Sequence, residues 1–297
     1  MWRRRRLAPP LLLMRRLYPF LFVFLWSTGF IGAKFGLPHA EPLSFLLARY
    51  LLVIALMGGI AFLSRAPWPG QPVQWLHIAV SGVLVHGIYL GGVFTAIKQG
   101  LPAGVTALVV GMQPLLTALG AGSFLGEPVS GRQWAGLLLG LLGVTLVVAG
   151  KFGEGVALGP MLLPALAALL GITAGTLYQK RFCARFDLRT GSVIQFFPCA
   201  VLTALVIAGF GDFHIEWTAQ FAFALAWLVL VLSIGAISLL NLLIRSGSAV
   251  NVASLFYLTP PTTALIAWAA FGETLAPAAL AGMGLAVGGV YLVGKSK

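Results

Sequence analysis

Hydrophobic positions along this chain gather into long continuous runs separated by short polar breaks. A helix needs about 20 apolar residues to cross the ~30 Å hydrocarbon core of a bilayer. Ten runs approach or reach that length, at roughly 17–37, 43–63, 74–96, 103–124, 133–150, 157–178, 190–210, 217–239, 249–271 and 276–294. The pattern therefore predicts ten membrane spans and leaves no segment for a soluble domain.

The runs are typical of helices rather than of barrel strands. A backbone inside lipid must satisfy its own hydrogen bonds, so only helices and closed barrels span a membrane. Barrel strands alternate apolar and polar residues over about ten positions, whereas LLLGLLGVTLVVAG and LVLVLSIGAISLLNLL are apolar throughout. We expect an all-α integral membrane protein.

Composition supports lipid as the main solvent. Hydrophobic residues make up 59% of the 297 positions and charged residues 9%, with a mean hydropathy of +0.98. Soluble domains carry about 25% charged residues. So few charges cannot cover a water-facing surface.

The basic start, MWRRRRLAPPLLLMRR, allows two interpretations. A signal peptide would have a longer apolar stretch and a small-residue cleavage site, but this stretch contains Pro9 and Pro10 and ends at Arg15 and Arg16. We favour a basic cytoplasmic tail over residues 1–16.

The basic residues also predict an orientation, because cytoplasmic loops are enriched in Lys and Arg. With ten spans and the N-terminus inside, 15 of the 19 basic residues fall on the cytoplasmic side, including those of QKRFCARFDLRTG. Both termini are then cytoplasmic. The net charge of +12 reflects this topology and contact with anionic lipid headgroups rather than nucleic acid.

The two halves of the chain are similar when one is shifted by 146 residues. The shift places Pro114 on Pro260, Thr117 on Thr263, Gly126-Glu127 on Gly272-Glu273, and Gly143-Val144 on Gly289-Val290. The halves, 17–151 and 152–297, then hold five spans each. An odd number of spans inverts the second repeat, as in many secondary transporters.

Several features together resemble one known family. They are the opening LFVFLWSTGFIGAKFGLPHAEPLSFLLARYLLV, the Pro-x-x-x-Ala-Leu and Gly-Glu pairs of both halves, and the glycine-rich fifth and tenth spans. Over residues 17–294 the chain resembles the EamA-type family of the drug/metabolite transporter superfamily. The resemblance implies a multi-pass carrier of the bacterial inner membrane, in a group associated with export of amino acids and other small metabolites. It implies neither a substrate nor a set of catalytic residues.

Two ionisable residues inside the spans are the strongest substrate-binding candidates. Arg49 lies about seven residues, or ~10 Å, inside the second span, where a guanidinium needs a cavity or a partner. It is suited to binding a substrate carboxylate, and the alternative is snorkelling or pairing with backbone carbonyls. His86, with Tyr89 on the same helical face, either lines a polar cavity and titrates during transport or is hydrogen-bonded between packed helices.

Weaker candidates accompany these residues. We expect several aromatic and amide side chains to face a central cavity: Trp26, Gln113, Tyr178, Asn241 and Tyr257. The alternative is that they pack between the helices or anchor them at the membrane interface. Pro114 and the Pro260-Pro261 pair interrupt the fourth and ninth spans at equivalent depth, as hinges or as fixed kinks. Small-residue pairs such as Gly136/Gly140 and Gly284/Gly288 predict close helix packing or a homodimer surface.

The acidic residues favour structural roles. Glu127 and Glu273 follow glycine at a helix end, where a carboxylate caps the free amides of the next helix. The spans contain no Asp or Glu, which argues against a carboxylate proton relay. Two scattered cysteines predict neither a disulfide framework nor a metal site, and we expect no cofactor.

Three other function classes stay open: a membrane-embedded enzyme, a flippase, and a channel or purely structural membrane protein. A membrane-embedded enzyme would need clustered acids, histidines or a nucleophile with its base, but His39, His77, His86 and His214 are scattered. A flippase for lipid or lipid-linked substrates is compatible with the same superfamily. The duplicated, proline-broken spans favour a carrier of small molecules by alternating access.

Overall fold

The computed structural model describes residues 9–101, 103–149, 160, 162–183, 185–211, 213–271 and 275–295. Within these residues the chain is helical, and the only strand-like pairing is a single bridge between Ala40 and Ile215. The elements are α1 (Pro9–Gly36), η1 (Leu37–His39), α2 (Pro42–Leu63), α3 (Pro72–Gly82), η2 (Val83–Ile88), α4 (Tyr89–Lys98), α5 (Ala103–Val110), α6 (Gln113–Gly120), η3 (Ala121–Leu125), α7 (Gly131–Ala149), α8 (Leu162–Phe182), α9 (Leu188–Phe210), α10 (Ala219–Trp227), η4 (Leu228–Ala236), α11 (Ile237–Ser246), α12 (Ala249–Ser254), η5 (Leu255–Leu258), α13 (Thr259–Phe271) and α14 (Pro277–Gly294).

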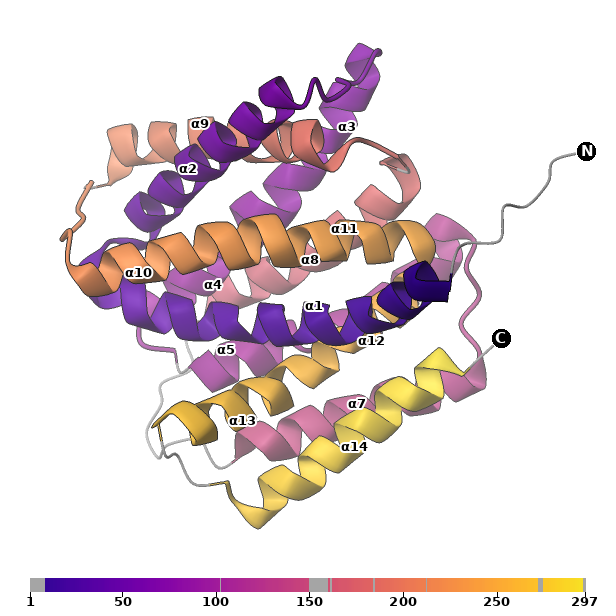
Figure 1. Cartoon of the computed structure of the whole chain (residues 1–297). Coiled ribbons are helices and arrows are strands. Elements are labelled where there is room, and N and C mark those ends of the chain that lie inside the picture. Colours follow the sequence, from indigo (N-terminus) through magenta and orange to yellow (C-terminus); the bar gives the residue numbers. More distant parts are fainter. Residues whose placement is uncertain are drawn as a thin grey trace, which may run out of the picture.

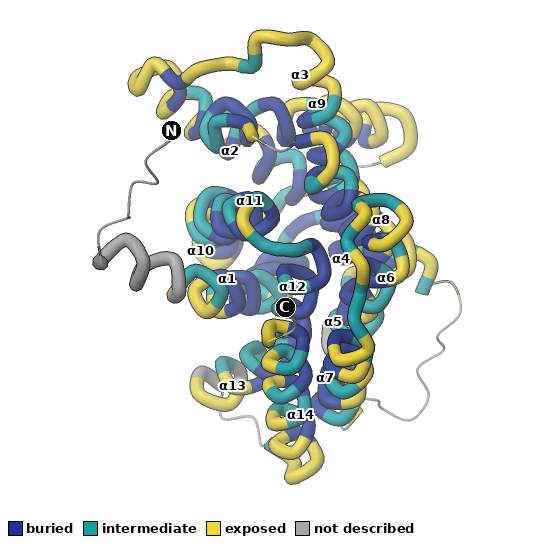
Figure 2. The backbone as a smooth tube through the Cα atoms, turned by 90° about the vertical axis from the view of Figure 1, so that its right-hand side faces the viewer, coloured by how far each residue is buried: buried dark blue, intermediate teal, exposed yellow. Residues whose placement is uncertain are grey.

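The all-α, ten-span prediction is confirmed. In the described part of the chain, ten segments are long and apolar enough to cross a bilayer: Leu17–His39, Pro42–Leu63, Pro72–Lys98, Val105–Leu125, Gly131–Ala149, Leu162–Phe182, Leu188–Phe210, Ala219–Ser246, Ala249–Ile266 and Pro277–Gly294. Large apolar side chains such as Phe62, Leu163 and Phe210 are exposed, as suits a surface in contact with lipid. Buried residues line the faces that the helices turn toward one another (Figure 2).

Some span ends differ from the predicted ones. The sixth span continues to Phe182 and the eighth to Ser246, so the helices include polar residues that a hydropathy pattern assigns to loops. Gln179 is buried at the end of α8 because it finds amide partners, and Lys180 donates to the carbonyl oxygen of Ile244 at 3.0 Å. At the N-terminus, α1 begins at Pro9, within residues 1–16, which were expected to form a cytoplasmic tail.

The third span of each half contains a stretch of π-helix. Val83–Ile88 (η2) separates α3 from α4, and Leu228–Ala236 (η4) separates α10 from α11. The 146-residue shift moves Val83–Ile88 onto residues 229–234, inside η4. The two wider turns are therefore equivalent features of the repeats, and such turns are frequent at functional sites.

Helices from the two halves pack against each other throughout (Figure 1). At the top of the view α2 lies beside α9, α1 runs below α10 and α11 across the middle, and α7 lies beside α14 at the bottom. The start of α2 meets the end of α9, because the Glu41 amide donates to the His214 carbonyl oxygen at 3.2 Å. The start of α9 meets the end of α2, where the Thr190 hydroxyl donates to the Pro67 carbonyl oxygen at 2.9 Å. The two helices are therefore antiparallel.

Glycines permit the close contact of α7 with α14. A Cβ atom added to Gly143 would lie 2.6 Å from the Gly282 carbonyl oxygen, and one added to Gly136 would lie 2.7 Å from that of Gly289. A Cβ atom on Gly284, by contrast, meets nothing within 4 Å among the described residues. Gly136 and Gly143 thus belong to an internal helix contact, whereas Gly284 lies on an outward surface, and a homodimer at that surface stays a prediction.

Candidate functional site

Arg49 is buried in the protein interior without a carboxylate partner. It lies on α2, with a relative exposure of 3%, and its Nε donates to the Ser233 hydroxyl of η4 at 2.9 Å. None of the ion pairs found among the described residues involves Arg49. An isolated charge is costly inside a membrane protein, so the burial of this guanidinium without a carboxylate among the described residues requires an explanation.

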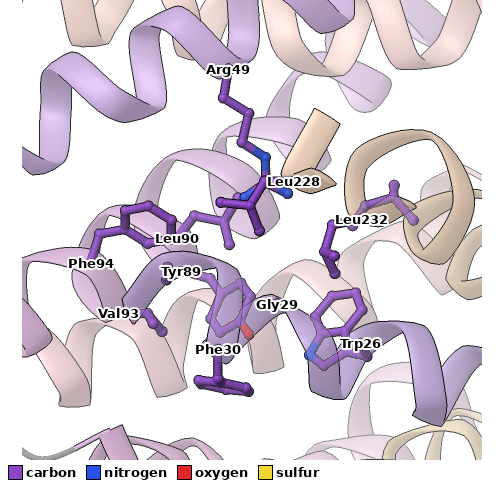
Figure 3. A pocket seen from close by; sticks show the side chains of 12 residues that line it. Trp26, Gly29, Phe30, Arg49, Tyr89, Leu90, Val93, Phe94, Leu228 and Leu232 are labelled. Carbon is purple, nitrogen blue, oxygen red and sulfur yellow. The ribbon is translucent and has the colours of Figure 1, made fainter. Parts of the chain in front are cut away.

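Arg49 lines a cavity enclosed by α1, α2, α4 and the π-helical part of the eighth span. Figure 3 shows its side chain reaching between Leu90 and Leu228 toward the rings of Tyr89 and Trp26. The two rings are nearly parallel, with centroids 6.1 Å apart. The cavity of about 40 Å³ has room for a few water molecules and not for a metabolite. In this conformation it is therefore closed to a substrate of that size.

The glycine face of α1 forms one wall of this cavity. A Cβ atom on Gly29 would lie 3.0 Å from Leu232, and one on Gly32 would lie 3.0 Å from Leu228. Gly171 and Gly175 of α8 make the corresponding contacts with η2, through Ile88 and Val85. Each first span therefore packs tightly on the π-helix of the other half.

His86 does not line the cavity. Its ring stacks on Phe196 at 4.1 Å with an angle of 13°, and its carbonyl oxygen accepts a 2.5 Å hydrogen bond from the Tyr50 hydroxyl. The side chain is 1% exposed. The wide turn η2 thus directs His86 toward α9, while Tyr89 faces α1 and the cavity.

The remaining predicted residues, Gln113, Asn241, Tyr178 and Tyr257, lie elsewhere in the protein. Gln113 of α6 donates to Thr176 at 3.2 Å, and Asn241 of α11 accepts from Gln179 at 2.7 Å. Tyr178 bonds to His77 at 2.7 Å near the end of α8. Tyr257 is fully buried in the cluster formed with α7. The structure therefore brings together Arg49, Trp26 and Tyr89 but not the whole predicted set.

Three functional candidates escaped the sequence analysis: Ser233, Gln179 and Gln195. Gln179 stands just after the predicted end of the sixth span, and Ser233 and Gln195 are single uncharged residues that do not interrupt a long apolar run. The repeat offset offers a signal for one of them, because a shift of 146 residues moves Arg49 onto Gln195. Gln195 is 1% exposed.

The prolines coincide with helix breaks. Pro114 follows the first residue of α6, where the fourth span is interrupted after Val110. Pro260 and Pro261 follow the first residue of α13, where the ninth span changes from the 3₁₀ turn η5 to an α-helix. The starts of α6 and α13 are 146 residues apart, so the two breaks are equivalent.

Glu127 binds a helix of the second half. Its Oε2 accepts from the Ala249 amide at the start of α12 at 2.8 Å, and its Oε1 lies 3.8 Å from Lys180 Nζ. The carboxylate thus lies at the start of α12 rather than at the next helix along the chain, α7. Glu273 lies outside the described residues. Within the described chain no three His, Cys, Asp or Glu residues gather as a metal site.

Comparison with known proteins decides the family. The model of the EamA-like transporter family matches residues 16–149 and again 159–295. The chain belongs to the EamA-like transporter family. Two matches in one chain agree with the two repeats, and family membership indicates a transporter of the drug/metabolite type rather than an enzyme.

Similar proteins in other bacteria are named as transporters or efflux pumps. An uncharacterized transporter of Bacillus subtilis, YvbV, is 30% identical over 93% of this chain and 90% of its own. A probable amino-acid metabolite efflux pump of Salmonella typhimurium is 30% identical over 92% of each chain. An S-adenosylmethionine/S-adenosylhomocysteine transporter of Chlamydia muridarum is 25% identical over 92% of this chain and 89% of its own.

A solved crystal structure has the same fold. It superposes with a TM-score of 0.74 at 24% identity and covers 93% of this chain and 94% of its own. The ten-helix arrangement therefore occurs in an experimentally determined structure of similar length.

Proposed function

We propose that this EamA-like transporter exports small metabolites that carry a carboxylate, across a bacterial inner membrane and by alternating access. The observation that carries the proposal is Arg49, a buried cation that lines a small cavity and whose one side-chain hydrogen bond among the described residues is to a serine hydroxyl. A guanidinium binds a carboxylate through two parallel hydrogen bonds.

The cavity walls suit the rest of such a substrate. Trp26 and Tyr89 present stacked aromatic faces, and Leu90, Leu228 and Leu232 are apolar. Small-molecule sites are mostly apolar with a few well-placed polar groups. An amino acid or related metabolite offers both kinds of surface, which agrees with the name of the Salmonella relative.

The arrangement of the repeats supports alternating access. Antiparallel packing of α2 with α9, which are equivalent helices, is the relation expected of inverted repeats. Equivalent breaks near Pro114 and Pro260 give each half a bend at the same depth. Rocking of one half against the other would open the cavity to one side at a time. The inner-membrane location agrees with the name of the Escherichia coli relative YedA, an uncharacterized inner membrane transporter.

Counterflow into proteoliposomes tests the proposal. Vesicles loaded with unlabelled amino acids should accumulate labelled amino acids above protein-free controls, and Arg49→Gln should lower this uptake about tenfold or more because a charged hydrogen bond is worth roughly 1.5–3 kcal/mol. Arg132→Gln, at an exposed position of α7, is the matched control and should behave as the wild type. Uptake that is limited to compounds without a carboxylate, or that is indifferent to Arg49→Gln, would contradict the proposal, as would movement of fluorescent lipid alone.

A further inference from the structure

Gln195 occupies in the second half the place that Arg49 occupies in the first. Each lies seven residues after the first residue of its helix, Pro42 of α2 and Leu188 of α9. Each bonds to the third span of the other half: Arg49 to Ser233, and Gln195 Nε2 to the Ser81 hydroxyl at 3.1 Å. The repeat thus forms two polar positions, one cationic and one neutral.

The two positions lie at a separation that suits a small molecule. Because α2 and α9 are antiparallel and their ends are aligned, residues seven positions into helices of 22 and 23 residues are about 12 Å apart along the axis. The two helices approach closely beside these positions, because the rings of Tyr50 and Phe196, the residues that follow Arg49 and Gln195, have centroids 5.7 Å apart. His86 lies between them, since its carbonyl oxygen bonds to Tyr50, the neighbour of Arg49, and its ring stacks on Phe196, the neighbour of Gln195.

Gln195 belongs to a row of buried amides. Its Nε2 lies 3.5 Å from Gln179 Oε1, and Gln179 Nε2 donates to Asn241 Oδ1 at 2.7 Å. The three side chains come from α9, α8 and α11, and all are at most 2% exposed. A row of amides connecting three spans is costly in a membrane protein unless every group is paired.

The row leaves one hydrogen-bonding group unpaired at each end. Asn241 Nδ2 and Gln195 Oε1 are buried and have no partner in good hydrogen-bond geometry among the described residues, although the His86 ring lies beside Gln195. Rotating all three amide groups by 180° exchanges their N and O atoms. The unpaired atoms would then be Gln195 Nε2 and Asn241 Oδ1, so one donor and one acceptor would still lack a partner. Unpaired buried groups of this kind require an explanation, and a ligand with its own acceptor and donor provides one.

We propose that Gln179, Gln195 and Asn241 form a second recognition site, which binds the uncharged hydrogen-bonding part of the substrate whose carboxylate binds Arg49. This inference rests on the proposed function. The spans supply no carboxylate to this row, so an amide or hydroxyl group fits it and an ammonium group does not. In the closed structure the amides bond to one another, and in the open protein they exchange these bonds for the substrate.

Two amino acids of similar length test the proposal in the full-length protein: glutamine, which ends in an amide, and norleucine, which ends in a methyl group. Counterflow should favour glutamine by about tenfold or more, because a site built to hydrogen-bond discriminates strongly against an analogue that lacks the group. Gln195→Leu and Asn241→Leu should bring the ratio close to one. Arg49→Gln should lower uptake of both compounds and preserve their ratio.

A matched control separates recognition from folding. Gln133 is a buried amide that bonds to Asn251 at 3.2 Å, outside the row, so Gln133→Leu should leave the ratio unchanged. Thermal unfolding of each variant in detergent identifies those that merely misfold, and Gln195→Asn, which keeps the amide, should retain part of the preference. Arg49-dependent uptake without any preference for glutamine, or a preference that survives both leucine variants, would overturn the second site and leave the proposed function standing. Uptake of neither amino acid alongside uptake of compounds without a carboxylate would overturn both.

Discussion

Asp187 secures the start of α9, the helix that carries Gln195. Its Oδ1 accepts from the Arg189 amide at 2.9 Å, and its Oδ2 accepts from Arg189 Nη2 at 2.6 Å. This side-chain hydrogen bond and the accompanying positive charge hold the pKa of Asp187 below its ordinary value. Because the pKa of Asp187 is lower in the folded than in the unfolded protein, its carboxylate stabilises the fold at pH values above the unfolded-state pKa of ~3.9. This contribution to stability is lost as the pH falls through the folded-state pKa.

Asp187→Ala should therefore reduce stability by about 1 kcal/mol at pH 7, the typical value of an N-cap. Asp187→Asn should have a smaller effect because asparagine also caps helices. Thermal unfolding in detergent at pH 7 and near pH 3 measures both changes. The difference between wild type and Asp187→Ala should shrink at the lower pH, and an equal difference at both values would show that the charge contributes nothing.

For single residues, the sequence predicted which residues are buried in the spans better than it predicted which neighbours their side chains face. Arg49 was accessible to prediction because a lone charge in an apolar run is conspicuous. The π-helical turn η2 then separates His86 from Tyr89, although regular helical spacing places them on one face. Gln179 was assigned to a loop because hydropathy falls there, whereas amide partners on other helices keep it buried.

At the scale of the helices, the close contact of α7 with α14 depends on glycines, which have no side chain to hold the two backbones apart. Gly143→Ala would place a methyl group 2.5 Å from the Ala286 amide nitrogen, so the helices must separate. Overpacking of this kind costs about 1–3 kcal/mol. Gly284→Ala, which meets nothing within 4 Å among the described residues, is the matched control and should be neutral or stabilising by up to about 1 kcal/mol.

The melting temperatures of the two variants in one detergent compare these effects directly. Equal shifts would mean that helix propensity rather than close packing decides the stability of this pair. A lower melting temperature for Gly284→Ala alone would instead indicate that its outward face is covered, as in a homodimer. That result would give the predicted dimer its first direct support.

Helix number and proline breaks were predictable, and π-helical turns were not. Long apolar runs determine ten spans through simple length, and proline removes a backbone donor wherever it occurs, so α6 and α13 begin next to Pro114 and Pro260. No residue type is specific for a π-turn. The turns η2 and η4 are contacted by the glycine faces of α8 and α1, and such contacts between distant segments cannot be read from local sequence.

For the molecule as a whole, the sequence shows that the two halves are repeats but not which helices pack against each other. The 146-residue shift identifies equivalent helices, yet nothing in it tells that α2 packs on α9 or α7 on α14. These pairs come from side-chain fit between segments far apart in the chain. Pairing is also what brings the equivalent positions Arg49 and Gln195 onto two adjacent helices, as the proposed two-part site requires.

The orientation of the whole molecule follows from the positive-inside rule and can be tested by cysteine labelling. The loop after α2, which contains Ser64, should be cytoplasmic, and the loop before α10, which contains Glu216, should be external; both residues are exposed. Cys183 and Cys199 are buried, and burial raises the pKa of the Cys183 thiol to about 11, so the native thiols should react slowly. An impermeant maleimide added to intact cells should then modify Glu216→Cys at once and Ser64→Cys only after permeabilisation. The reverse order would place both termini outside, and equal labelling of both positions in intact cells would show that the chain inserts in two orientations.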